Sequence, residues 1–165
     1  MKQQEIERKF LVKSDGWRGK GSGELFRQGY IARTQDRTVR VRVAGERGTL
    51  TIKYRGAGIA RSEFEYAIPL DEAQALLDGL EPGEIIEKMR FTFEENGDVW
   101  EVDEFMGANA GLVVAEIELA SEEQNFVRPD WLGEEGSKIS RYLNVELSHL
   151  PYTAWTAEQR QEGKK

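Results

Sequence analysis

Charged side chains recur two residues apart along this chain, a spacing that places them on one face of an extended strand. In the stretch "EIERKF", Glu5, Glu7 and Lys9 share one face, while Ile6 and Phe10 lie on the other. The alternation returns downstream in these pairs: Arg40 and Arg42, Lys53 and Arg55, Glu63 and Glu65, Lys88 and Arg90, Glu101 and Asp103, and Glu116 and Glu118. One such pair is typical of a solvated face. So many pairs without Ser, Thr or Gln indicate a dedicated charged surface.

These residue types suit two kinds of binding. Carboxylates that converge with other oxygen ligands form a site for a hard cation such as Mg²⁺ or Mn²⁺. Arginines and lysines on neighbouring strands hold phosphate oxygens, Arg through two parallel hydrogen bonds and Lys as a point charge. A metal and a cationic clamp together serve phosphoryl transfer, because its catalysis is mostly positioning and charge stabilisation.

The strands that carry these residues are predicted at 4–12, 25–33, 38–44, 49–55, 61–69, 85–94, 99–105 and 112–120. Eight strands with few helices favour an antiparallel barrel or a strongly curved sheet, mainly β in an α+β chain. The residues between the charged ones, such as Val41, Phe64 and Ile117, are large and apolar, so helices and loops must cover their face.

If the sheet closes, the charged face becomes the interior, and an eight-stranded barrel is wide enough for one small ligand. Charges there must stay wet, pair with one another or bind ions, since desolvation costs several kcal/mol per ion.

Residue types that favour turns and helices predict the segments between and after the strands. Asn96-Gly97 between two alternating runs predicts a hairpin, and turns are also predicted at 44–48 and 56–58. Residues 13–23 read as a loop that Trp17 pins to the body. Asp71 is expected to cap a helix that Pro82-Gly83 stops. Further helix is expected within 130–150. Residues 1–157 then form a single tunnel domain, and 158–165 a flexible tail.

Composition narrows the classes of protein. The chain has 165 residues, a formal net charge of −7 and no cysteine, which excludes disulfides and cysteine nucleophiles. The negative charge argues against general nucleic-acid binding. Because no apolar run approaches the roughly 18 residues of a membrane span, we expect no membrane association and a cytoplasmic location. The chain lacks G-x-x-x-x-G-K-[ST] and G-x-S-x-G motifs, and His149 is better explained as a surface or structural residue than as a catalyst.

The ordered set of motifs resembles the CYTH superfamily, the triphosphate tunnel metalloenzymes. E-x-E-x-K at Glu5–Lys9 is followed by R-x-R, K-x-R, E-x-E, K-x-R, Asp103 and a second E-x-E, and the resemblance runs to about Asn144. It implies an eight-stranded antiparallel tunnel with a charged interior and flanking helices. It also implies a divalent metal, Mg²⁺ or Mn²⁺, and a small triphosphate-bearing substrate.

Residue roles follow from this resemblance by position. The implied metal ligands are Glu5, Glu7, Asp103, Glu116 and Glu118. The implied phosphate cradle is Lys9, Arg40, Arg42, Lys53, Lys88 and Arg90, with Lys53 and Lys88 as the catalytic candidates. Arg55 could bind phosphate or pair with an acid, and Tyr30 matches a tyrosine that can point into the tunnel. In "SRYLN", where Leu143 replaces the family's serine, either Lys138 or Arg141 supplies the late basic residue. The roles of Glu63 and Glu65 stay open.

Members of the superfamily differ in activity. The start "EIERKFLV" and the short length look most like small bacterial members, which are often inorganic triphosphatases. The implied reaction is hydrolysis of inorganic triphosphate to diphosphate and phosphate. The alternatives are a class IV-type adenylate cyclase and a thiamine or nucleoside triphosphatase. A non-catalytic polyphosphate-binding module is less favoured, because all the acids are present. A homodimer is left open.

Overall fold

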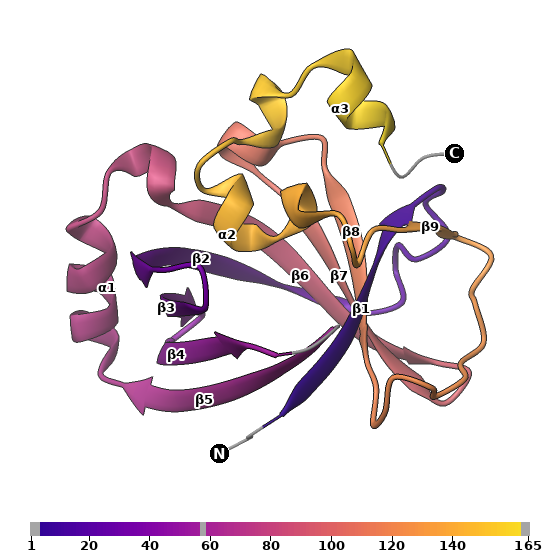
Figure 1. The fold of residues 1–165 in the computed structure, drawn as a ribbon, viewed down its shortest axis with the longest axis horizontal. Helices are drawn as coiled ribbons and strands as arrows, with labels where there is room; N and C mark the ends of the chain where they lie inside the picture. Colours follow the sequence, from indigo (N-terminus) through magenta and orange to yellow (C-terminus); the bar gives the residue numbers. More distant parts are fainter. Residues whose placement is uncertain (1–3, 57–58, 163–165) are drawn as a thin grey trace.

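A single antiparallel sheet closes on itself in the computed structural model, which describes residues 4–56 and 59–162 (Figure 1). Its strands are β1 (Glu5–Val12), β2 (Ser22–Arg33), β3 (Arg37–Ala44), β4 (Arg47–Arg55), β5 (Ala60–Ile68), β6 (Ile86–Glu95), β7 (Asp98–Phe105), β8 (Val113–Glu118) and β9 (Leu132–Glu135). The order β5-β4-β3-β2-β6-β7-β8-β1 is closed by pairing of β1 with β5. The predicted eight-stranded antiparallel barrel is confirmed.

Strand β1 closes the barrel and takes part in three pairings. Along one edge, Glu7–Leu11 pair with β8. On the other edge, Glu5 and Ile6 pair with β5, whereas Phe10 and Val12 pair with β9. The short strand β9 therefore occupies the part of the β1 edge that β5 leaves free. It lies at the start of the segment 130–150, in which the sequence predicted further helix; that helix forms later in the segment, as η3 (Ser140–Tyr142) and α2 (Asn144–Leu147).

The hairpin between β6 and β7 forms as predicted. Asn96 has φ of 56° and Gly97 of 82°. Two consecutive positive φ angles match the twist of the flanking strands and suit Asn-Gly. The predicted turn at 56–58 falls partly on residues 57 and 58, which lie outside the described residues.

The apolar face of the strands points outward and is covered. Phe10, Trp100 and Ile117 belong to one buried cluster together with Trp17 and Trp131. Trp17 is 1% exposed, and its ring centroid lies 5.2 Å from that of Phe91. The loop between β1 and β2 is thus held to the barrel by Trp17, as the sequence predicted.

Helix α1 (Leu70–Asp78) covers the outer face of β3 and β4 (Figure 1). Ala73 and Leu77 are buried against Val41. A side chain at Gly48 would bring its Cβ within 2.8 Å of the Ala73 Cβ, so glycine permits this close approach. The helix starts two residues earlier than predicted: Pro69 is at the N-cap position, and Asp71 lies in the first turn, where the positive end of the helix dipole favours its negative charge.

The chain after β9 continues over the barrel in a series of short helical turns (Figure 1). These are η3 (Ser140–Tyr142), α2 (Asn144–Leu147), η4 (Tyr152–Ala154) and α3 (Ala157–Gln161); earlier turns are η1 (Pro82–Glu84) and η2 (Gly107–Asn109). Helix α3 begins with a capping box between Thr156 and Gln159. Residues 158–161, predicted as flexible tail, are therefore helical, and 163–165 lie outside the described residues. No helix in the described part is both long and apolar enough to span a membrane.

Candidate active site in the barrel

A cavity of about 240 Å³ lies within the barrel, and we call it the tunnel cavity. Most of the residues that the sequence singled out line it: Glu5, Glu7, Lys9, Tyr30, Arg40, Arg42, Lys53, Glu63, Glu65, Lys88, Arg90, Glu101, Glu116 and Glu118. Thr38, Arg61 and a stretch of the segment after β9, Leu143 to Val145, complete the wall. The acids come mainly from β1, β5 and β8 and the arginines from β3 and β6. The barrel thus brings residues from distant parts of the chain to one space.

Asp103 lies behind this wall and ties two cations together. Its side chain is fully buried and accepts two hydrogen bonds from Arg90, of 2.7 and 2.8 Å, and one of 2.7 Å from the Lys88 Nζ. Burial alone would raise the pKa of Asp103, but Arg90 and Lys88 outweigh it and lower this pKa to about 2. Asp103 is therefore ionised and fixes the positions of both basic side chains.

The cations are crowded on the side of β2, β3 and β6. The Arg42 Nε donates to the Gln28 Oε1 at 2.8 Å, and the ring of Phe26 lies 4.6 Å from the Arg42 guanidinium and 5.0 Å from that of Arg90. Burial first, and then the charges of Arg40 and Arg90, lower the pKa of Arg42 to about 9. Positive charge is therefore in excess on this side, and a bound polyanion would offset it.

Lys88 belongs to the same group and is fully buried. Its Nζ also donates to the Asn144 Oδ1 at 3.0 Å, which connects the barrel to α2. Burial is the main reason that the pKa of Lys88 is lowered to about 7; Asp103 opposes this effect, while Arg90 and Arg42 add to it. A phosphate oxygen near Lys88 would favour its charged form.

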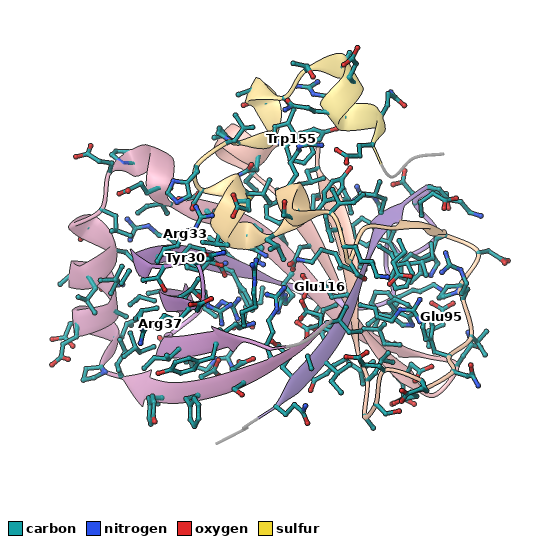
Figure 2. The ribbon with its side chains drawn as sticks, viewed as in Figure 1. Tyr30, Arg33, Arg37, Glu95, Glu116 and Trp155 are labelled. Carbon is teal, nitrogen blue, oxygen red and sulfur yellow. The ribbon has the colours of Figure 1, made fainter. Side chains whose placement is uncertain are left out.

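The acids on the opposite side are partly neutralised by lysines. The Lys9 Nζ lies 3.0 Å from a Glu116 oxygen, and the Lys53 Nζ lies 2.7 Å from a Glu5 oxygen. Glu7 differs, because burial and the neighbouring Glu116 raise its pKa to about 7. In Figure 2, Glu116 lies beside β1, across the barrel from Tyr30 and Arg37.

This acidic side provides oxygen donors of the type that hard divalent cations prefer. Within residues 4–56 and 59–162, no three acidic side chains are grouped closely enough to hold a metal ion as they stand. Burial is the main reason that the pKa of Glu7 is raised and the charge of Glu116 adds to it, so a cation bound between these two carboxylates would offset their repulsion. The oxygen donors therefore fit a divalent cation. To bind it, the carboxylates would have to exchange their present ion pairs with Lys9 and Lys53 for contacts with the metal.

Two buried polar atoms on the wall have no hydrogen-bond partner among the described residues. They are the Arg40 Nε and the Glu63 Oε2, on residues that are each 9% exposed; the Glu63 Oε2 has an ion-pair contact of 3.5 Å with the Lys53 Nζ. Other atoms of Arg40 reach Thr51 at 3.2 Å and Glu65 at 3.8 Å. A donor left unpaired at a cavity wall costs stability, so it indicates room for a ligand there.

Three predicted substrate-binding residues do not line the tunnel cavity. Arg55 is exposed and lines neighbouring cavities at the end of β4. Lys138 is exposed on the outside. Arg141 pairs with Glu162, and its guanidinium lies 5.4 Å from the Trp155 ring centroid, so it attaches α3 to the barrel. His149 is exposed, as expected.

Sequence reasoning also missed residues of the site. Arg61 lies two positions before Glu63 on the same face of β5, so the period of two could have identified it. Gln28, two positions before Tyr30, is fully buried and bridges Arg42 and Asn144, the latter at 3.4 Å. Gln28 carries no charge, and Asn144 lies in a short helix, so the charge pattern could not have identified either.

Glu7→Gln should stabilise the metal-free protein. At pH 8 the wild-type native state holds Glu7 ionised against burial and Glu116, whereas Gln carries no charge. We expect a gain of roughly 2 kcal/mol, on the order of 5 °C in melting temperature at pH 8 in EDTA. Since the folded-state pKa is raised above that of the unfolded chain, the gain should shrink as the pH falls from 8 to 5. A difference in melting temperature between E7Q and wild type that stayed constant with pH, or that was negative at pH 8, would contradict this account.

Comparison with known proteins agrees with this arrangement. The family model for the CYTH domain matches residues 3–148. A protein of Acetivibrio thermocellus named inorganic triphosphatase is 49% identical over 148 residues, which cover 90% of this chain and 95% of the relative. An inorganic triphosphatase of Nitrosomonas europaea is 36% identical over 152 residues, 87% of this chain and 96% of the relative. A crystal structure of an inorganic triphosphatase superposes with a TM-score of 0.66 at 33% identity, covering 87% of this chain and 93% of its own.

The family model spans most of the chain, and it includes every strand that lines the tunnel cavity. The two relatives exceed 30% identity over nearly their whole length. The charged interior, the barrel closure and these matches agree, and the chain belongs to the CYTH domain family.

Proposed function

We propose that this protein hydrolyses inorganic triphosphate to diphosphate and phosphate within the tunnel cavity. The observation that carries the proposal is the two-sided wall of that cavity, with crowded arginines on one side and acids on the other. The names of its relatives, inorganic triphosphatase in each case, support the same activity. Water adds to the terminal phosphorus while the bond to the bridging oxygen breaks, which releases the diphosphate.

The basic side chains would hold the triphosphate. Arg40, Arg42 and Arg90 can donate guanidinium hydrogen bonds to the phosphate oxygens. Lys9 and Lys88 can each place a positive charge beside these oxygens. Lys53 and Lys88, our catalytic candidates, would offset the charge that builds up on the departing diphosphate. We leave Arg141 and Lys138 out of the substrate site, because they lie outside the tunnel cavity.

The acids that face the tunnel cavity would hold a divalent metal, either Mg²⁺ or Mn²⁺. They are Glu5, Glu7, Glu116 and Glu118, and Asp103 would support them through Arg90 and Lys88. The bound metal would polarise phosphate oxygens and favour hydroxide over water. Glu7 and Glu116 lie close enough to perturb each other, so they are the first pair to be tested.

The partner we propose is a small triphosphate anion, and the cytoplasmic location stays a prediction from the sequence. Nucleic acid is disfavoured by the net charge of −7. The lining of the tunnel cavity also argues against a nucleotide base as a required feature, because most of its side chains are charged. A pocket for a base is usually apolar with a few placed polar groups.

The direct test is a phosphate-release screen over triphosphates with Mg²⁺, with Mn²⁺ and with excess EDTA. Inorganic triphosphate should be hydrolysed far faster than ATP, and ATP with Mn²⁺ should yield little cyclic AMP. The reason is that water at the terminal phosphorus needs only the charged wall, whereas a cyclase must also hold adenine and aim the ribose 3′-hydroxyl. If cyclic AMP and diphosphate were the main products and triphosphate a poor substrate, the cyclase alternative would replace this proposal.

A further inference from the structure

A second cavity, also of about 240 Å³, adjoins the tunnel cavity, and we call it the outer cavity. The two cavities share wall residues, namely Thr38, Lys53, Arg61, Leu143 and Val145. The remaining wall of the outer cavity comes from the turn between β2 and β3, the ends of these strands and of β4, and Glu146 of α2. The two cavities are therefore neighbours that meet at these shared side chains.

The outer cavity is much more basic than the tunnel cavity. Its basic residues are Arg33, Arg37, Lys53, Arg55 and Arg61, against the acids Asp36 and Glu146. The tunnel cavity, in contrast, is lined by seven basic and seven acidic side chains. Glu146 is already paired with Arg33, and no acid of residues 4–56 and 59–162 forms an ion pair with Arg37, Arg55 or Arg61. Positive charge accumulates here on a chain whose net charge is −7.

The backbone holds these arginines together in spite of their repulsion. The Thr34 N–H donates to the Arg37 carbonyl at 2.9 Å, and the Arg55 N–H donates to the Asp36 carbonyl at 2.8 Å. Arg55 lies opposite Arg61 in the register of β4 and β5. In Figure 2, Arg33 and Arg37 both lie on the side of β2 to β4, away from Glu116. Arg33 has Glu146 as its partner, whereas Arg37, Arg55 and Arg61 lie in one cavity wall without an acidic ion-pair partner among the described residues, and such like charges form a ready site for an anion.

We propose that the outer cavity is a capture site for the substrate polyanion, a linear oligophosphate, before it enters the tunnel cavity. The inference rests on the proposed triphosphatase function. Arg37 and Arg55 bind the anion first, and Lys53 and Arg61, which face both cavities, pass it inward. A basic cleft on an otherwise negative protein concentrates anions and raises association rates by about 10- to 10³-fold. Arg37 and Arg55 do not line the tunnel cavity, so they assist binding and leave the chemical step alone.

The test compares two double variants that remove the same charge. R37Q/R55Q acts on the outer cavity. R27Q/R47Q is the control: Arg27 pairs with Asp78 and Arg47 with Glu24, both at the surface, and Arg47 lies at the other end of the β3–β4 hairpin. At low ionic strength, kcat/KM of R37Q/R55Q for tripolyphosphate should fall about 10-fold with kcat within about twofold of wild type. In about 0.5 M KCl most of this loss should disappear, because salt screens exposed charges. The control should stay within about twofold of wild type throughout.

Three outcomes would overturn the inference. An unchanged kcat/KM at low salt would show that the outer cavity does not capture substrate. An equal fall in kcat would place these arginines at the reacting phosphate. An equal loss of kcat/KM in R27Q/R47Q would show that the effect comes from the net charge of the protein and not from the outer cavity.

A binding measurement separates this inference from the proposed function. Calorimetry with tripolyphosphate in EDTA needs no turnover, and we expect weaker binding in R37Q/R55Q but not in R27Q/R47Q. Equal affinities in all three proteins would reject the capture site, even if hydrolysis were observed. A loss confined to R37Q/R55Q would support it, even if another reaction replaced hydrolysis.

Discussion

Replacing Glu116 by Gln should lower the rate of triphosphate hydrolysis by at least roughly 10³-fold, and Glu7→Gln should do nearly the same. Glu116 is 8% exposed, faces Lys9 at 3.0 Å and raises the pKa of Glu7. The amide keeps the size of the side chain but removes charge that a divalent cation needs. The measurement is phosphate release at saturating tripolyphosphate across a titration of Mg²⁺ or Mn²⁺.

The matched control is Glu134→Gln, because Glu134 is exposed on β9 and lines none of the cavities described above. Circular dichroism and the melting temperature should show that E116Q and E7Q are folded. Wild-type turnover in excess EDTA, or a fully active E116Q, would refute the metal-dependent mechanism.

On the cationic side, Arg42→Gln should reduce kcat/KM for tripolyphosphate by about 10²-fold or more. Burial and the charges of Arg40 and Arg90 lower the pKa of Arg42, so the empty protein holds this guanidinium at a cost. A bound triphosphate removes that cost, and the interaction is therefore worth more here than at an exposed arginine. Steady-state kinetics on R42Q give the measurement.

The melting temperature distinguishes loss of a ligand contact from loss of the fold. Because like charge is removed, R42Q should melt at or above the wild-type temperature in the absence of triphosphate. Lys20→Gln serves as the control, since Lys20 pairs with Glu95 at the surface and should change neither property. A strongly destabilised R42Q, or one with wild-type kcat/KM, would contradict the proposed cradle.

The sequence by itself determined which residues share a face. In a strand, side chains alternate with a strict period of two, so Glu5, Glu7 and Lys9 had to lie together whatever the strand paired with. The apolar residues between them had to be buried, which required the charged face to be the interior once the sheet closed. Asn96-Gly97 determined its own turn, because both residues tolerate positive φ. These are local properties, and the sequence shows them directly.

Only the tertiary structure decided how the charges pair and where the barrel closes. The contact between Lys53 and Glu5 joins residues 48 positions apart, through the register of β1 with β5. Strand β9 forms because β5 leaves part of the β1 edge unpaired, which no local pattern in 132–135 reveals. Arg141 belongs to the pattern "SRYLN", yet the packing of α3 directs it to Glu162. Such long-range contacts depend on the closure of the whole sheet, and that closure brings the acids of β1 and β8 opposite the arginines of β3 and β6.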